Sequence, residues 1–522
     1  MIAAAQQMPR HPLLVAGSVM VACLLYSIDW TIAAVALPHM QGTFSATQDQ
    51  VSWVITSYIV ASAIMIPTSG WMADRFGRKR VFVGAVAGFT AASILCGAAN
   101  SLTVEVLARI VQGMSGAFLI PLSLAIILDT FPEEQHAKAM AYWGIGSVCG
   151  AVFGPTIGGY LTEYFSWRYI FYLNIPFGLL ALIGVLLFLP ETERDPNKKL
   201  DWFGFLTLAV GIGALQMMLD RGQRLDWFES GEIIFEASLA AISLYMFNMH
   251  VLTHREPFLD PRVFLQRNFF VALIMISFYG LLTVPPMVLM PTFLETVRGY
   301  SIDTVGMLQS PRGVGILLAF FITGRIANKV DPRAMIVFGF VCLGLSTAAM
   351  SQWSVDVGTW PIVWTGFLGG IGAGVILVPA QMVAFSTLAP NKRNEGTAVF
   401  NLIRTMFSSI GVSVILALFV VVGAMGRAEM VEHVTPYNQV LQYPGHAGDY
   451  TAGSERGLAI IEREIDKQAA MKGYNTAFLM LSLGALAAIP LVLLIGRAKP
   501  GSKERERERE QFEKNEPIMI AE

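Results

Sequence analysis

Ionisable side chains inside long apolar runs are the residues of this sequence best placed to do chemistry. Asp29 and Glu105 are the clearest acids in such runs, and Arg109 follows Glu105 by four residues. An ionised group inside a membrane costs free energy, so each of them is a candidate functional group. A nearby guanidinium favours the carboxylate form of an acid, whereas desolvation favours the protonated form. A movement that altered either effect could load a proton on Asp29 and release it elsewhere, which is what proton coupling requires.

The depths of Asp29 and Arg109 in their expected helices agree. Asp29 lies eight residues before the end of the apolar run 12–37, and Arg109 lies seven residues after the start of the run 102–129. At about 1.5 Å per helical residue, both side chains are expected roughly 10 to 12 Å below the same surface. The sequence therefore predicts that they could face each other. Glu105 shares a helix face with Arg109, so it is either an intrahelical ion-pair partner or a second proton carrier.

Two further arginines, Arg312 and Arg404, also lie well inside apolar runs. Each could satisfy backbone carbonyl groups or line a substrate cavity. Aromatic and polar side chains at comparable positions suit many small ligands. The candidate cavity residues are Tyr58, Gln112, Phe278, Tyr279, Arg312, Asn401 and Arg404.

The apolar runs are expected to be membrane-spanning helices. Of the 522 residues, 54% are hydrophobic and 14% are charged, whereas a soluble domain carries roughly a quarter of charged residues. A helix needs about 20 apolar residues to cross the hydrocarbon core, and lipid offers no partner to an open backbone. We count fourteen runs, near residues 12–37, 50–72, 81–99, 102–129, 139–161, 169–189, 202–220, 233–250, 269–293, 304–328, 333–352, 360–388, 397–424 and 474–495.

Basic residues set the expected orientation of these helices. Lys and Arg are concentrated in the short connections on the side of the N-terminus, which is typical of the cytoplasmic side of a membrane. An even number of spans then puts both termini in the cytoplasm. The first run is not expected to be a cleaved signal, because its apolar stretch continues past Asp29 to Leu37.

No pattern in the sequence indicates an enzyme, a metal site or a bound cofactor. Cys23, Cys96, Cys149 and Cys342 lie far apart within apolar runs and have neither disulfide nor metal-ligand spacing. No match to a nucleotide-binding loop, and no pairing of a nucleophile with a nearby base, is better than chance would give. The net charge of -2 gives no case for binding nucleic acid.

A repeated motif divides the chain into two related halves. Gly70–Arg80 recurs in blurred form as Gly324–Arg333, and Gly116–Pro121 recurs as Gly374–Pro379. In both cases eight expected spans separate the copies. Two six-helix bundles alone would place equivalent motifs six spans apart. The two helices within 202–250 are therefore read as an insertion between the halves.

These motifs and their spacing resemble a known family. Gly70–Arg80 resembles the signature loop of the major facilitator superfamily, and the inserted pair is similar to its fourteen-span drug:proton antiporters, the EmrB/QacA subfamily. Ile28–Pro38 resembles the first-span motif, and Leu215–Gly222 with Leu225–Phe228 resembles EmrB-type exporters in particular. The resemblance implies an all-α integral membrane fold of the major facilitator type. Its parts would be a cytoplasmic N-terminus (1–11), an N-terminal six-helix bundle (12–189), two inserted transmembrane helices (202–250), a C-terminal six-helix bundle (269–495) with a periplasmic loop (425–472), and a charged cytoplasmic tail (496–522).

In this family the signature loop is a conformational latch. The resemblance implies that Asp74 bonds to Arg78 and to the positive N-terminus of a second-half helix, latching an outward-open state. Gly77 would allow the tight turn that brings these groups together. Gly70 and Arg75 complete the motif.

Two further motifs are similar to those of proton-coupled members. Leu107–Gly116, which contains Arg109, resembles the family's proton-transfer motif, and Phe367 stands at the equivalent position in the second half. Glycines at every fourth position from Gly146 to Gly158 predict a ridge that another helix can approach closely. The residues that resemble the antiporter motif are Gly150, Gly154, Pro155, Gly158 and Gly159, with Pro155 expected to bend the helix.

The resemblance implies a proton-coupled antiporter that exports amphipathic small molecules, such as drugs and toxic lipophiles, across the bacterial inner membrane. The alternatives are a dedicated exporter of one endogenous metabolite, for example a siderophore, and a membrane sensor or scaffold that does not transport. The proton gradient would replace any cofactor. A periplasmic membrane-fusion adaptor and an outer-membrane channel are the expected partners. The loop 425–472, with an amphipathic helix over Glu455–Lys467, is either a solvated lid or a docking surface.

Overall fold

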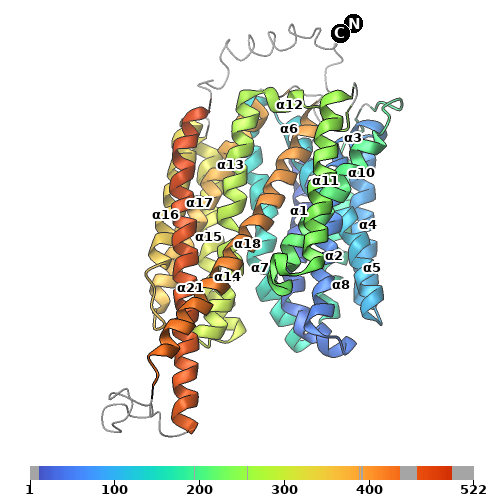
Figure 1. Cartoon of the computed structure of the whole chain (residues 1–522). Helices are drawn as coiled ribbons and strands as arrows, with labels where there is room; N and C mark the ends of the chain where they lie inside the picture. Colours follow the sequence, from blue (N-terminus) through green and yellow to red (C-terminus); the bar gives the residue numbers. More distant parts are fainter. Residues whose placement is uncertain are drawn as a thin grey trace.

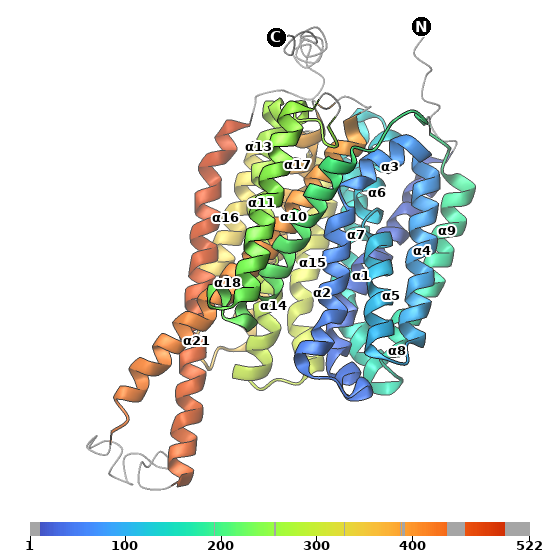
Figure 2. The same cartoon turned by 45° about the vertical axis from the view of Figure 1, so that its right-hand side comes forward.

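The structure is a computed structural model, shown in Figures 1 and 2, that describes residues 11–192, 194–254, 257–327, 329–386, 388, 392–435 and 455–495. Every regular element within these residues is a helix, which confirms the all-α expectation. The long helices lie side by side in one bundle (Figure 1). The expected tail 496–522 and nearly all of the N-terminal segment 1–11 lie outside the described residues.

The helices of the N-terminal half follow the apolar runs of the sequence. They are α1 (Pro12–Phe44), α2 (Gln48–Met65), α3 (Thr68–Phe76), α4 (Arg78–Ala98), α5 (Leu102–Gly116), α6 (Leu119–Thr130), η1 (Glu133–Gln135), α7 (His136–Tyr164), α8 (Arg168–Tyr172) and α9 (Asn174–Phe188). Side-chain caps explain where two of these helices begin. Thr47 and Gln50 form a capping box at the start of α2, and the Ser101 hydroxyl accepts from the Val104 N–H at the start of α5.

The inserted helices precede the C-terminal half. They are α10 (Trp202–Arg221) and α11 (Gly231–Thr253), joined by η2 (Gly222–Leu225) and η3 (Trp227–Glu229). The C-terminal half consists of α12 (Arg262–Leu265), α13 (Arg267–Thr283), α14 (Pro285–Thr292), the π-helix η4 (Phe293–Val297), α15 (Ile302–Ile326), α16 (Pro332–Met350), α17 (Thr359–Ser386), α18 (Arg393–Glu432), α21 (Glu455–Leu491) and η6 (Val492–Leu494).

Length and composition test the expected number of spans. In the part of the chain that the structure describes, twelve helices are long and apolar enough to cross a membrane, or up to thirteen if the bent pair Gln50–Met65 and Thr68–Phe76 is one span. The two helices of this pair meet at 57° beside Pro67. The expected run 139–161 lies in α7, a 29-residue helix outside that count. The chain is thus a multi-pass membrane protein, but the number fourteen is not confirmed.

The inserted helix α10 contacts both halves of the protein (Figure 2). Gln216 Nε2 of α10 donates to Ser409 Oγ of α18 over 3.0 Å. On the other side, the Thr56 hydroxyl of α2 donates to Asp220 of α10. The insertion therefore lies against a seam between the two halves instead of standing apart from them.

The outer parts of α18 and α21 project from the bundle as a helical hairpin (Figure 2). We call this the hairpin end of the molecule, and the opposite end, which carries α3 and α12, the α3 end (Figure 1). Ion pairs join the two helices of the hairpin. Arg427 lies 3.2 Å from Glu462 and 2.7 Å from Asp466, and Lys472 Nζ lies 2.6 Å from Glu429 Oε2.

The structure therefore differs from the expected outer loop over 425–472. Residues up to Glu432 continue α18, and α21 begins at Glu455, which confirms the helix predicted over Glu455–Lys467. The sequence left this segment as either a solvated lid or a docking surface. Opposite charges on α18 and α21 face each other across the two packed helices, which extends both spans beyond the bundle. Residues 436–454 lie outside the described part of the chain.

Candidate functional site

Asp29 lies within α1, and its side chain is fully buried. Its two carboxylate oxygens accept three hydrogen bonds from α5 and α9. Arg109 Nη1 donates to Oδ2 over 2.7 Å, and the side-chain amides of Gln112 and Asn174 each donate to Oδ1 over 2.8 Å. Asp29 and Arg109 thus form a buried ion pair between helices that are distant in the sequence.

Arg109 is held from several directions. Its Nε donates to the Val54 carbonyl of α2 over 3.1 Å, and its Nη1 also donates to Gln112 Oε1 over 2.6 Å. The guanidinium carbon lies 4.3 Å from the ring centre of Tyr58 and 5.6 Å from that of Phe171. These distances allow cation–π attraction to both rings. A planar guanidinium can meet all these partners at once, whereas a lysine ammonium cannot.

The hydrogen-bond network continues to α4 through a residue that the sequence did not single out. Ser93 Oγ accepts from Gln112 Nε2 over 2.7 Å and from Asn174 Nδ2 over 3.0 Å. Asn174 was also missed, although a lone amide at the start of the otherwise apolar α9 could have pointed to it. Tyr58 and Gln112, predicted to line a cavity, are 1% and 0% exposed and belong to this buried network. We call the following residues the Asp29 cluster: Asp29, Tyr58, Ser93, Arg109, Gln112 and Asn174.

Glu105 is fully buried one turn before Arg109 but does not pair with it. Neither carboxylate oxygen of Glu105 has a hydrogen-bond partner among the described residues. The predicted intrahelical ion pair is therefore wrong for this arrangement, because the Arg109 guanidinium bonds instead to Asp29, Gln112 and the Val54 carbonyl. The other alternative, a second proton carrier, stays a prediction.

Glycines of α7 pack directly against α1 on either side of Asp29. A Cβ on Gly150 would lie 2.7 Å from the carbonyl carbon of Ser27, and a Cβ on Gly154 would lie 3.2 Å from Thr31 Cβ and nearer still to its hydroxyl. The Thr31 hydroxyl also donates to the Gly150 carbonyl over 3.3 Å. Because Ser27 and Thr31 flank Asp29, the close approach of α7 sets the position of the acid.

The remaining residues of the antiporter-like motif differ in how closely they approach α1. A Cβ on Gly158 would lie 2.5 Å from Ile32 Cγ1, so Gly158 continues the ridge. Gly159 lies off the ridge, since a Cβ there would meet nothing within 4 Å. The side chain of Pro155 lies outside the described part of the structure.

Asp74 lies at the end of α3, against the N-terminus of α18. Its Oδ1 accepts from Asn394 Nδ2 over 2.6 Å, and its Oδ2 accepts from Lys198 Nζ over 2.6 Å. Gly70, one turn earlier, packs on the backbone of Glu395, where a Cβ would lie 3.1 Å from the Cα. A first-half acid therefore contacts the start of a second-half helix, where an anion is favoured by the helix dipole.

Arg78 does not bond to Asp74, contrary to the expectation. Its guanidinium pairs instead with Asp129 at the end of α6. Asp129 also pairs with Arg393 of α18, whose Nη1 lies 2.6 Å from Oδ1. One carboxylate thus joins an arginine of each half. Sequence reasoning missed Asp129 and Arg393, because nothing in the spacing of either residue indicates this meeting.

The turn between α3 and α4 has the backbone expected of Gly77. Its φ of +91° lies in the region that favours glycine. Arg75 Nη1 donates to the carbonyls of Pro196 and Lys198 over 2.8 and 2.6 Å. The turn and the connection before α10 are therefore tied together at the α3 end.

The other cavity candidates lie in the C-terminal half. Arg312 donates from Nη2 to the Thr283 carbonyl over 2.6 Å and lines a small pocket with Gln309 and Met290. Arg404 Nη2 lies 3.4 Å from Asn401 Oδ1, the longest of these contacts. Within the described residues neither arginine forms an ion pair with a carboxylate. Of the aromatic candidates, Tyr279 is 8% exposed and Phe278 is partly buried against the core.

A multi-pass helical bundle in two halves, with a buried acid–arginine pair in one of them, has the architecture of a membrane transporter. Residues 19–412 match the Major Facilitator Superfamily, and the chain belongs to this family. It is therefore a transporter and not an enzyme.

Several relatives with assigned names match this chain over nearly its whole length. The chain is 34% identical to the fatty acid resistance protein FarB of Neisseria gonorrhoeae over 480 residues, which cover 91% of this chain and 93% of FarB. It is 32% identical to the multidrug export protein EmrB of Haemophilus influenzae, with 92% and 94% covered. It is also 34% identical to the probable multidrug resistance protein EmrY of Escherichia coli, again with 92% and 94% covered.

Solved structures of remote proteins show the same fold. A double tryptophan mutant of XylE superposes with a TM-score of 0.62 at 13% identity, covering 96% of this chain and 99% of XylE. The human organic anion transporter MFSD10 superposes with a TM-score of 0.61 at 15% identity, with 92% and 99% covered. At these identities the likeness concerns the arrangement of helices alone.

Proposed function

We propose that this protein is a proton-coupled antiporter that exports amphipathic small molecules across the bacterial inner membrane. The observation that carries the proposal is the buried pair of Asp29 and Arg109, with 2.7 Å between Oδ2 and Nη1. Ionisable residues inside a membrane protein mark ion or substrate pathways. Relatives named as multidrug exporters and as a fatty acid resistance protein support amphipathic substrates.

Hydrogen-bond donors surround the side chain of Asp29 in the present arrangement of the helices. Three N–H donors bond to its two oxygens. If the carboxyl group were protonated, its own hydrogen would face one of these donors in place of an acceptor. Displacement of α1 relative to α5 and α9 would remove these donors, and burial without donors favours the neutral acid. Asp29 would therefore take up a proton in one arrangement of the bundle and lose it on return to the other. Coupling follows when the two arrangements open to opposite sides.

The contacts at the α3 end would alternate with this movement. Asp74 and Asp129 of the first half bond to Asn394 and Arg393 of α18 in the second half. We place the α3 end in the cytoplasm, because basic residues are concentrated in its connections. The observed contacts then keep the halves together on the cytoplasmic side. Substrate would enter after these contacts break, and it would leave at the hairpin end.

The hairpin is the proposed contact surface for a periplasmic adaptor. In this orientation it projects into the periplasm, and Val431 and Leu458 each expose 46% of their surface on it. Ile461 is 7% exposed and so packs within the hairpin. Exposed apolar side chains on a projecting helix suit helix-in-groove recognition. An adaptor held there would connect this transporter to an outer-membrane channel.

Reconstitution into liposomes tests the proposed function. A pH gradient should drive transport of a lipophilic fluorescent dye or of a medium-chain fatty acid, and collapse of the gradient by an ionophore should stop it. Transport that ignores the gradient would contradict proton coupling. Failure to move any lipophile, together with loss of one secreted compound from cells that lack the gene, would indicate a dedicated exporter. Failure in both assays would favour a sensor or scaffold.

A further inference from the structure

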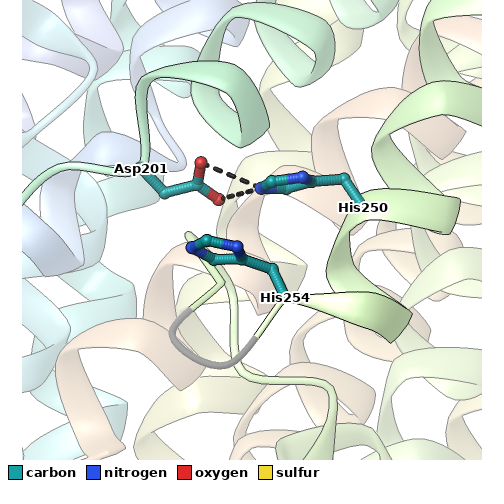
Figure 3. A group of neighbouring side chains, drawn as sticks. All are labelled: Asp201, His250 and His254. Atoms are coloured by element: carbon teal, nitrogen blue, oxygen red, sulfur yellow. Dashed lines mark hydrogen bonds and ion pairs between the residues drawn. The ribbon is translucent and has the colours of Figure 1, made fainter.

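Asp201, His250 and His254 come together on the inserted helices, as Figure 3 shows. Asp201 directly precedes α10, His250 lies in the last turn of α11, and His254 follows that helix by one residue. The candidate ligand atoms of the three side chains all lie within 4.8 Å of one another. None of these residues belongs to the Asp29 cluster or to the contacts of Asp74 and Asp129.

The distances in this group approach those of a metal centre. His250 Nε2 lies 3.0 Å from Oδ1 and 2.9 Å from Oδ2 of Asp201. The two imidazole rings stack with their centres 4.7 Å apart and 21° between their planes. Ligand atoms bound about 2 Å from one tetrahedral ion lie roughly 3.3 Å apart. The Asp201–His250 pair already fits this spacing. Rotation of the exposed His254 side chain would bring its ring nitrogen to a similar distance from both of them.

We infer that Asp201, His250 and His254 form a binding site for a divalent transition metal of the Zn²⁺, Co²⁺ or Ni²⁺ class. Two imidazoles and one carboxylate match the preference of these ions for nitrogen ligands, and waters would complete the coordination. Mg²⁺ and Ca²⁺ prefer sets made of oxygen alone, so they should bind poorly here. The sequence shows no metal-ligand spacing here. Asp201 stands 49 positions before His250, and only the packing of the two inserted helices brings them together.

Backbone hydrogen bonds hold the Asp201 carboxylate in position. The Gly204 N–H donates to Oδ1 over 2.9 Å, and the Phe258 N–H donates to Oδ2 over 3.0 Å. Each oxygen keeps a lone pair for a metal, and outer hydrogen bonds of this kind orient metal-binding carboxylates.

The three candidate ligands differ in their exposure to solvent. The side chains of Asp201 and His250 are 7% and 17% exposed, whereas His254 is exposed. An ion could therefore enter past His254 and reach ligands that are already partly desolvated. Once bound, it would join the end of α11 to the start of α10 and, through the Phe258 N–H, to the segment that leads into α12.

Calorimetric titration of the full chain in detergent with ZnCl₂ tests this inference, with protein purified without a polyhistidine tag. The wild type should bind one Zn²⁺ per chain. His254→Asn should lower the affinity at least about tenfold, because even outer contacts of a metal site are worth about 10- to 100-fold. Because His254 is exposed and follows the last residue of α11, this variant should elute like the wild type in size-exclusion chromatography. Co²⁺ absorption in the visible range gives a second readout, and His254→Asn should lose it.

His39→Asn serves as the matched control, because His39 is also exposed but lies on α1, away from this group. It should bind Zn²⁺ as the wild type does. Equal affinities of the wild type and His254→Asn would overturn the inference, as would a wild type that binds no Zn²⁺. Displacement of Zn²⁺ by equimolar Mg²⁺ would likewise overturn the proposed ligand class.

Discussion

Gly150 packs so closely on Ser27 that a Cβ on the glycine would lie 2.7 Å from the Ser27 carbonyl carbon. A backbone atom cannot rotate out of the way, so any side chain at position 150 must push α7 and α1 apart. Ser27 stands two residues before Asp29, whose carboxylate depends on donors from α5 and α9. The packing of two helices and the hydrogen bonds of the buried acid are therefore one geometric unit.

Gly150→Ala should reduce transport by at least about tenfold, because α1 would have to shift by about 1 Å and reacting groups tolerate little misplacement. Transport per molecule in liposomes is the measurement, with membrane insertion checked by size-exclusion chromatography. Gly159→Ala is the matched control, since a Cβ there meets nothing within 4 Å. Gly154→Leu should impair transport as Gly150→Ala does. Normal transport by Gly150→Ala would show that the glycine ridge serves ordinary helix packing and does not position Asp29.

Asp29→Asn should keep the fold and ligand binding but lose proton coupling, because an amide cannot take up and release a proton. Proton release on addition of substrate to liposomes should fall to background. Asp356→Asn is a suitable control, because that side chain is 97% exposed and remote from the Asp29 cluster. Release of wild-type size from Asp29→Asn would assign coupling to another acid, with Glu105 the first to test.

Arg109→Lys should impair coupling, since an ammonium cannot contact Asp29, Gln112 and the Val54 carbonyl together. Arg109→Ala should be worse and should also destabilise the protein by about 3–5 kcal/mol, the usual cost of leaving one member of a buried pair alone. Thermal unfolding and coupled transport measure the two effects separately. If Arg109→Ala transports normally and Arg404→Ala does not, the coupling role belongs to the second half.

Asp129→Asn should weaken the closure of the α3 end, because Arg78 and Arg393 would then face each other without their shared carboxylate. Labelling of a cysteine introduced beside Asn394 should become faster in this variant. Adding Arg393→Gln should restore part of the protection, since it removes the like charge. Arg325→Gln, on an exposed arginine away from α18, is the control for loss of a cation. Unchanged labelling in Asp129→Asn would argue against the latch.

Deletion of residues 430–470 should weaken co-purification of a membrane-fusion adaptor while leaving coupled transport in liposomes intact. Point variants make the test sharper. Leu458→Asp should weaken adaptor recovery as the deletion does, because Leu458 is 46% exposed, and Thr296→Asp, on an exposed site outside the hairpin, should not. Equal recovery from Leu458→Asp, the deletion and the intact protein would move the docking site elsewhere, with the connection between α10 and α11 as the next candidate.

The sequence by itself determined the class of this protein. Long apolar runs, a repeated motif and family-like spacing all predict a helical membrane transporter in two halves with an insertion, and the match to the Major Facilitator Superfamily confirms the family. These signals are readable because hydropathy and helix period are local properties of the chain. The constant rise of a helix also predicted that Asp29 and Arg109 lie at one depth, and the structure places them in contact. Their role in proton coupling stays a prediction.

Only the tertiary structure decided which side chains meet. It brought Asn174 and Ser93 to the Asp29 cluster, gave Arg78 the partner Asp129 in place of Asp74, and left Glu105 without the expected ion pair. It also turned an expected loop into a hairpin and assembled a candidate metal site. These outcomes depend on how each helix is rotated against its neighbours. That rotation is set by packing between residues as far apart as Asp129 and Arg393, 264 positions, which no local pattern records.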